Sequence, residues 1–224
     1  KGEYSLIICH ETYSCFTAIA IKKREGIPYV AFVYDPISYI LPRVYKKRAV
    51  GLLLPFLSPL GLFLDRKIIE NAEETVCCSC LHLPWLEKFY PGRKYSVIYP
   101  GCNPLEKIPE RRGEFILSLS KWDIGKNPYF LLDVLNRVKN KNVRLIVAGN
   151  WIQNSLKVNF LNRAKELGLA ERVWLTGLIS DATKVRLFSE ARVLIHPIVE
   201  AFGMFGLEAA AHGCPTIIPK GSGV

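Results

Sequence analysis

The sequence predicts an α/β protein with two Rossmann-like domains, each built on a parallel sheet. Short apolar segments without polar alternation recur along the 224 residues, as expected for strands that are buried on both faces of a sheet. Amphipathic helical segments separate them, and this alternation is typical of parallel α/β folds. A stretch rich in proline, glycine and charge near the middle of the chain divides the strands into two series, which predicts two domains.

Nine segments are predicted to be strands. The first series comprises residues 4–9, 28–33, 75–80 and 95–99. The second series comprises residues 115–119, 143–148, 173–176, 193–197 and 215–219. Between strands of the second series, residues 128–139 place their apolar side chains on one helical face. A further helix is predicted over 181–191, with Ser180 or Asp181 as its N-cap.

The stretch between the two series reads "YPGCNPLEKIPERRGE" (99–114), which we interpret as an interdomain linker. The domains expected from it are residues 1–105 and residues 106–224. The chain starts at Lys1, enters a strand almost at once, and ends soon after another strand. Both domains are therefore expected to be incomplete, as in a piece of a longer protein.

The two halves of the chain differ in charge. Residues 1–110 hold 14 basic and 11 acidic side chains, whereas residues 111–224 hold 16 and 9. An anionic ligand is therefore expected in the second half. The sequence has no zinc-finger spacing, no arginine-rich block and no strip of interleaved aromatic residues, so we do not expect it to bind nucleic acid.

The seven cysteines are odd in number and lack the spaced framework of a small secreted scaffold, which favours a reducing, cytoplasmic compartment. Cys77 and Cys80 form a C-x-x-C pair near His82, so zinc has to be considered. A second pair of ligands at suitable spacing is missing from the sequence, and "ETVCCSC" is typical of a buried strand. We therefore expect no metal ligand in the chain.

Residues 43–67 combine an apolar run with flanking positive charge. The run over 49–64 has 16 residues interrupted by Pro55 and Pro59, whereas a transmembrane helix needs about 20 unbroken residues. Its flanks carry Arg43, Lys46, Lys47, Arg48, Arg66 and Lys67. Two interpretations stay open: a helix packed inside the first domain, and a peripheral helix on an anionic membrane surface.

The most informative motif is "HPIVEAFGMFGLEAAAHGCPTIIP" (196–219). A strand is expected to end near Pro197, and a helix is expected to begin around Phe202 or Gly203 and to end at Gly213. In open α/β sheets, ligands bind at the carboxyl ends of the strands, which is where this motif lies.

Helix geometry suggests what this motif can bind. The backbone N–H groups of Phe202, Gly203 and Met204 would point out of the helix start toward a phosphate, and Gly203 would allow a close approach. Glu208, inside the helix, can accept hydrogen bonds from two ribose hydroxyls. Glu200, before the helix, would face what lies beyond the phosphates.

The same motif resembles a known family. "EAFGMFGLEAAAHGCP" is similar to the E-x7-E signature of the retaining glycosyltransferases of the GT-B fold, family 4 (glycosyl transferases group 1). "ILSLSKWDIGKNPYFLLDVL", "VRLIVAGN" and "RVWLTGLISDATKVRLFSEARVLIHP" resemble further segments of the family's donor-binding domain, in the family's order. "LIICHETYS" and "YSVIYPGCNPLEKIP" resemble its HxHE strand end and its linker. The similarity covers nearly the whole chain.

The resemblance implies catalytic roles for four residues. Lys121 and Lys126 match an arginine and a lysine that neutralise the β-phosphate of the donor as the sugar–phosphate bond breaks. Glu200 matches the residue that holds the hydroxyls of the donor sugar. His10 matches a histidine that faces this sugar from the opposing domain. Lysine in place of arginine at 121 loses the bidentate geometry of a guanidinium.

The resemblance also implies a nucleotide site. Glu208 matches the ribose ligand, and the other residues expected at the nucleotide are Phe202, Gly203, Met204 and Leu178. His196 and His212 are assigned mainly to structure. The chain departs from the family pattern where Ser120 and Ala201 replace glycines, Phe205 replaces a proline, and "PGCN" replaces the linker's NGVD.

The function implied is the transfer of a hexose from a nucleoside-diphosphate sugar to a hydroxyl acceptor, lipid-linked or on a polysaccharide, with retention of configuration. Residues 1–105 would belong to the acceptor-side domain and residues 106–224 to the donor-binding domain. The sequence contains no Asp-x-Asp motif, so a metal-independent reaction is expected. Two alternatives stay open: a nucleotide-sugar epimerase on the same fold, and a degenerate, non-catalytic subunit that binds a membrane or a partner.

Overall fold

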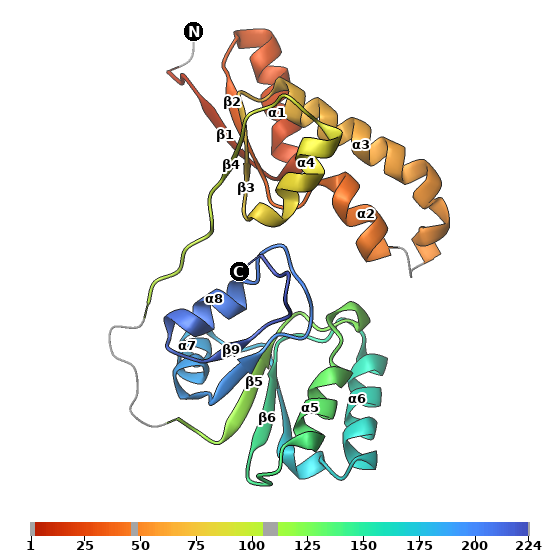
Figure 1. The fold of residues 1–224 in the computed structure, drawn as a ribbon, viewed down its shortest axis with the longest axis vertical. Helices are drawn as coiled ribbons and strands as arrows, with labels where there is room; N and C mark the ends of the chain where they lie inside the picture. Colours follow the sequence, from red (N-terminus) through yellow and green to blue (C-terminus); the bar gives the residue numbers. More distant parts are fainter. Residues whose placement is uncertain (1–2, 46–48, 105–111, 224) are drawn as a thin grey trace. The chain divides into compact units, whose positions relative to one another are not determined.

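The structure is a computed structural model and describes residues 3–45, 49–104 and 112–223. The chain divides into two compact units between Pro100 and Gly101. Each unit contains its own parallel sheet with helices packed on it (Figure 1), which confirms the predicted fold class. The boundary expected at 105/106 lies outside the described residues and stays a prediction.

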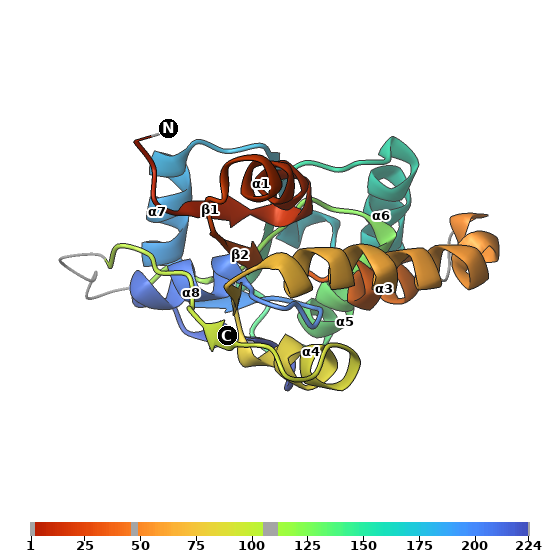
Figure 2. The ribbon, with the colours of Figure 1, turned by 90° about the horizontal axis from the view of Figure 1, so that it is seen from above.

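The first unit holds a four-stranded sheet in the order β1-β2-β3-β4, with every neighbouring pair parallel. Its strands are β1 (Ile7–His10), β2 (Tyr29–Val33), β3 (Glu74–Cys77) and β4 (Tyr95–Val97). Its α-helices are α1 (Glu11–Glu25), α2 (Ile37–Tyr45), α3 (Leu54–Asn71) and α4 (Leu83–Phe89). In Figure 2, α3 is seen from the side along its whole course. Among the described residues, no helix is long and apolar enough to cross a membrane.

The second unit holds a five-stranded parallel sheet in the order β7-β6-β5-β8-β9. Its strands are β5 (Phe115–Leu119), β6 (Arg144–Ala148), β7 (Val173–Gly177), β8 (Val193–Ile195) and β9 (Thr216–Ile217). Its α-helices are α5 (Tyr129–Arg137), α6 (Asn154–Glu166), α7 (Asp181–Glu190) and α8 (Met204–Ala211). The chain adds β6 and β7 on one side of β5 and then returns to add β8 on the other.

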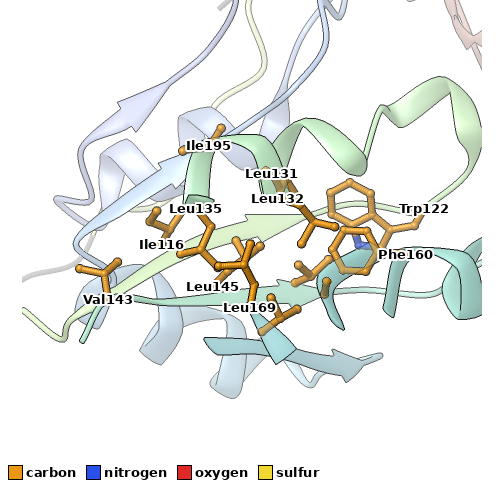
Figure 3. Packing of buried hydrophobic residues seen from close by; sticks show 13 residues of the cluster. Ile116, Trp122, Leu131, Leu132, Leu135, Val143, Leu145, Phe160, Leu169 and Ile195 are labelled. Atoms are coloured by element: carbon orange, nitrogen blue, oxygen red, sulfur yellow. The ribbon is translucent and has the colours of Figure 1, made fainter. Parts of the chain in front are cut away.

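Both faces of this second sheet are covered, which explains why its strands are apolar without alternation. On one face, side chains of β5 and β6 pack under α5 and α6, with Trp122 and Phe160 fully buried (Figure 3). On the other face, Leu117, Leu119 and Ile146 pack against α7 and α8. Successive residues of β5 and β6 thus enter opposite cores.

The nine predicted strands all form, and most differences lie at their ends. The strand predicted over 75–80 ends at Cys77, because Ser79 accepts a hydrogen bond from the N–H of Leu81 and caps a 3-10 turn that begins at Cys80. Cys80 is therefore exposed rather than buried in a strand. All seven cysteines are free thiols. The expected cytoplasmic location stays a prediction.

The strand order of the second unit defines where a ligand can bind. The order in which strands are added to the sheet reverses at β5, because β6 lies on one side of it and β8 on the other. The carboxyl ends of β5 and β8 are neighbours at this switch point, which is where open α/β sheets bind their ligands. The loop after β5 carries Lys121 and Lys126, and the loop after β8 carries Glu200.

Candidate functional site

Lys126 is held in place by the short loop that follows β5. Asp123 caps a 3-10 turn (Ile124–Lys126), and its Oδ1 accepts hydrogen bonds from the N–H groups of Gly125 and Lys126 at 2.7 and 3.1 Å. Asn127 then adopts a left-handed conformation with φ 49°, which ends the turn. The backbone of Lys126 is thus fixed at the carboxyl edge of the sheet.

Glu200 receives two partners at this edge. Its Oε1 forms an ion pair with Lys126 Nζ, which bridges the loops after β5 and β8. Its Oε2 lies 3.3 Å from Nε2 of His196, a buried residue that directly follows β8. The pairing across the sheet brings together two residues that are 74 positions apart and that the resemblance had assigned to the same reaction.

The surroundings of Glu200 hold it in the ionised form. Burial raises the pKa of this carboxyl, but its contacts with His196 and Lys126, together with the positive charge of Lys126, outweigh burial and lower the pKa to about 2. Glu200 is therefore an anionic hydrogen-bond acceptor throughout the neutral range, which suits it to bind hydroxyl groups.

Glu208 lies on the second turn of α8 and pairs with α7. Its Oε1 lies 3.1 Å from Lys184 Nζ, which is also 3.4 Å from Oδ1 of Asp181. Its Oε2 is shielded from solvent and has no hydrogen-bond partner among the described residues. Burial lowers the pKa of Lys184. The carboxylates of Glu208 and Asp181 raise it by more than burial lowers it, so Lys184 is a cation at neutral pH. One carboxylate oxygen of Glu208 is thus left to accept hydrogen bonds from a ligand.

The start of α8 differs slightly from the expected one. The helix begins at Met204, with Gly203 as the N-cap whose carbonyl accepts hydrogen bonds from the N–H groups of Gly206 and Leu207. Phe202 and Gly203 precede the helix, so the first-turn N–H groups without intrahelical carbonyl partners are those of Met204 and Phe205. The positive end of the helix still lies between Glu200 and Glu208 along the chain.

A close backbone approach shapes the loop that carries Lys121. Gly149, after β6, has φ 111°, and a Cβ atom there would lie 1.9 Å from the carbonyl oxygen of Ser120. Only glycine fits this position. Lys121 directly follows Ser120 and is exposed, so its ammonium group is available to an anion.

The remaining predicted residues lie at strand ends. Leu178 follows β7 at the same edge of the second sheet and is 80% exposed. His10 ends β1 in the first unit, where its Nδ1 lies 3.0 Å from the hydroxyl of Tyr34 and its ring stacks on Phe32. The structure therefore brings Lys126, Glu200 and α8 into one site. His10 lies in the other unit.

Two residues at the site were not predicted. His196 was assigned to structure, yet its imidazole lies against Glu200; its spacing of four residues from Glu200 was a usable signal. Lys184 escaped notice because its partner is 24 residues away on another helix, and no local pattern links them. His212, in contrast, has the structural role expected of it: its Nδ1 lies 2.7 Å from the carbonyl of Glu208 near the end of α8.

The candidate zinc ligands of the first unit are not gathered into a site. Cys77 and His82 are buried and Cys80 is exposed. Burial, with a contribution from Arg43, lowers the pKa of His82 to about 4. Among the described residues, no three His, Cys, Asp or Glu side chains are grouped so that they could hold a metal ion.

Residues 106–224, more than half of the chain, match the model of the family described as "Glycosyl transferases group 1". An uncharacterised glycosyltransferase of Methanocaldococcus jannaschii is 24% identical over 241 aligned positions, which cover 99% of this chain and 59% of that protein. The chain therefore spans about three fifths of the length of this relative.

Solved structures share the fold. HepE of Anabaena in complex with UDP has a TM-score of 0.79 and 19% identity, over 99% of this chain and 61% of that one. HepE with UDP-glucose has a TM-score of 0.75 and 18% identity, again over 99% and 61%. Sucrose-phosphate synthase from Thermosynechococcus elongatus has a TM-score of 0.75 and 18% identity, over 95% and 55%. These glycosyltransferases have the GT-B fold, to which the two parallel sheets of this chain correspond.

Proposed function

This chain belongs to the glycosyl transferases group 1 family, and we propose that the intact protein transfers a hexose from a nucleoside-diphosphate sugar to a hydroxyl acceptor with retention of configuration. The observation that carries the proposal is a pair of carboxylates at one sheet edge, each bound to its own lysine. Glu200 pairs with Lys126, and Glu208 pairs with Lys184. The binding of UDP and UDP-glucose by HepE supports a donor of this class.

The nucleotide half of the donor would lie along α8. The Oε2 of Glu208, unpartnered within the described part of the chain, would accept hydrogen bonds from the ribose hydroxyls, and Leu178 would offer an apolar surface to the base. The diphosphate would then meet the N–H groups of Met204 and Phe205 at the positive end of the helix. Residues 106–224 would thus form the donor-binding part of the protein, and residues 1–105 would belong to the acceptor side.

The sugar half would lie beyond the phosphates, next to Glu200. Ionised at neutral pH, Glu200 would accept hydrogen bonds from the sugar hydroxyls. In the reaction, the bond between the anomeric carbon and the β-phosphate oxygen breaks, and negative charge grows on the leaving diphosphate. Lys126 and Lys121 would stabilise this charge, which is largest in the transition state. The acceptor hydroxyl forms the new bond to the anomeric carbon and gives its proton to the oxygen of the leaving diphosphate.

We also propose that the reaction needs no metal ion. Two lysines and a helix N-terminus supply the positive charge that a diphosphate leaving group requires, and the sequence has no Asp-x-Asp motif. His10, in the first unit, is proposed to contact the donor sugar, as the family resemblance implies.

A donor screen on the intact protein tests the proposal. Calorimetry with a panel of nucleoside diphosphates and their sugars should identify one base that binds, and the best donor should give a glycoside whose anomeric configuration, read by NMR, matches the donor. A product of inverted configuration would refute the retaining mechanism. An epimerised free sugar would indicate the epimerase instead, and binding of no nucleotide would indicate the degenerate subunit.

A further inference from the structure

An exposed apolar stripe runs along the first half of α3 and has no role in the donor site. It consists of Leu53, the N-cap residue just before the helix, and of Phe56, Leu60 and Phe63 within it, whose exposed fractions are 54%, 77%, 50% and 53%. Their spacing of three, four and three residues places them on one face of the helix. We call this set the α3 stripe.

The opposite face of α3 is the one that the fold buries. Gly61, Asp65, Ile68 and Ile69 are buried on that side. A Cβ atom at Gly61 would lie 3.1–3.3 Å from atoms of α2, so the two helices are in close contact, side by side in Figure 1. The helix is therefore anchored by one face, and the α3 stripe is not needed for the packing of the described unit.

Positive charge accompanies the α3 stripe. Lys67 lies one turn after Phe63, and its Nζ is 5.4 Å from the centre of the Phe63 ring. Arg66 is exposed beside it, with its Nε 4.0 Å from Oε1 of the exposed Glu70. Between residues 36 and 69 the sequence contains six Lys and Arg but one acid, Asp65.

That single acid does not offset the charge at the surface. Asp65 is 2% exposed, and its two oxygens accept hydrogen bonds from the N–H groups of Ile37 and Ser38 at the start of α2. The carboxylate is thus used inside the fold. Exposed carboxylates are therefore missing from this segment until Glu70, one turn beyond Arg66.

We propose that the α3 stripe docks on a membrane surface that contains anionic lipid. A one-sided apolar face flanked by lysine and arginine fits the boundary between headgroups and acyl chains, with the aromatic and leucine side chains inserted and the cations on the phosphates. Because the other face of α3 is held by its own unit, the helix would lie in the plane of the surface. This inference does not depend on the donor site.

Vesicle co-sedimentation of the intact protein tests the inference. The vesicles are pure phosphatidylcholine or phosphatidylcholine with a third of phosphatidylglycerol, at low and high salt. Binding should require phosphatidylglycerol and fall with salt. The double variant F56S/F63S, which replaces exposed side chains, should lose roughly tenfold or more in binding, and R66Q/K67Q should lose a similar factor.

Matched controls come from the second unit. K157Q/K165Q removes the same charge from the exposed face of α6, and F130S removes a partly exposed phenylalanine of α5. Both should bind vesicles as the unchanged protein does. Equal binding by F56S/F63S, equal binding to neutral and anionic vesicles, or no binding at low salt would each overturn the proposal.

A second measurement identifies other occupants of the α3 stripe. In F56W, the added tryptophan emission should be that of an exposed indole in buffer and should shift to the blue with anionic vesicles. Emission already blue-shifted in buffer would show that another part of the protein covers the stripe. A dimer in light scattering that F56S dissociates would show that a second copy covers it. Either result would overturn the membrane proposal.

Discussion

The ammonium group of Lys184 lies 3.1 Å from Oε1 of Glu208, so α7 supplies a cation to the carboxylate that α8 presents. The pair is more than three-quarters buried, and the second oxygen of Glu208 has no partner among the described residues. This arrangement orients the carboxylate and leaves one of its oxygens for a ligand. It also makes Lys184 a positioning residue for the proposed ribose contact.

Replacing Lys184 should therefore weaken nucleotide binding even though Lys184 itself does not contact the nucleotide, because it orients Glu208. We expect Lys184→Met to lower the affinity for the nucleoside diphosphate about threefold to tenfold, which corresponds to about 1 kcal/mol. Calorimetry on K184M, E208Q and the double variant forms a double-mutant cycle. The losses should be less than additive; fully additive losses would show that the two residues act independently.

The two glutamates should separate binding from turnover. Glu208→Ala should weaken nucleotide binding by about 1.5–3 kcal/mol, because the ribose hydroxyls lose a charged acceptor. Glu200→Ala should bind the nucleotide nearly as tightly and should chiefly lower kcat. Calorimetry with the nucleoside diphosphate and steady-state kinetics with the full donor measure the two effects. If Glu200→Ala weakened nucleotide binding and Glu208→Ala chiefly lowered kcat, the proposed orientation of the donor would be wrong.

Lys126 should contribute most in the transition state. Removing a donor to developing charge costs on the order of 2–4 kcal/mol, so we expect Lys126→Ala to lower kcat/KM by roughly 30-fold to 1,000-fold. Lys157→Ala on α6 is the matched control and should leave the rate unchanged. A loss confined to KM would instead assign Lys126 to ground-state binding.

Glu200 should make the stability of the second unit depend on pH. Its pKa is held near 2 in the folded protein, below its ordinary value of 4.5, so its ionised form stabilises the fold. The contribution is complete above about pH 5 and is lost as the pH falls toward 2. Urea unfolding of the unchanged protein and of E200Q should show a stability difference that narrows over this range. A difference that widens on acidification would disprove the assignment.

A metal chelator should leave the activity intact. Transfer assays with the preferred donor should give the same rate with and without EDTA, because side chains and the start of α8 balance the charge of the diphosphate. If EDTA abolishes the activity and Mn²⁺ restores it, the cationic mechanism is wrong.

Local sequence patterns were sufficient for the secondary structure and for part of the site. Apolar runs marked all nine strands, and Ser180 or Asp181 was predicted as an N-cap; the structure has Ser180, whose side chain accepts a hydrogen bond from the N–H of Thr183. Such features depend on neighbours within a few residues. The helix after Glu200 was placed within two residues of its start for the same reason, although the exact N-cap, Gly203, depends on how the loop packs.

Partnerships between distant residues were decided by the tertiary structure. The strand order β7-β6-β5-β8-β9 places the loops after β5 and β8 together, and only this placement joins Lys126 to Glu200 across 74 residues. The sequence by itself determined which residue types stand at the ends of strands, because hydrophobic periodicity and capping are local. It did not determine that His196 and Lys184 would contact the two glutamates, because such contacts depend on the packing of α7, α8 and the sheet.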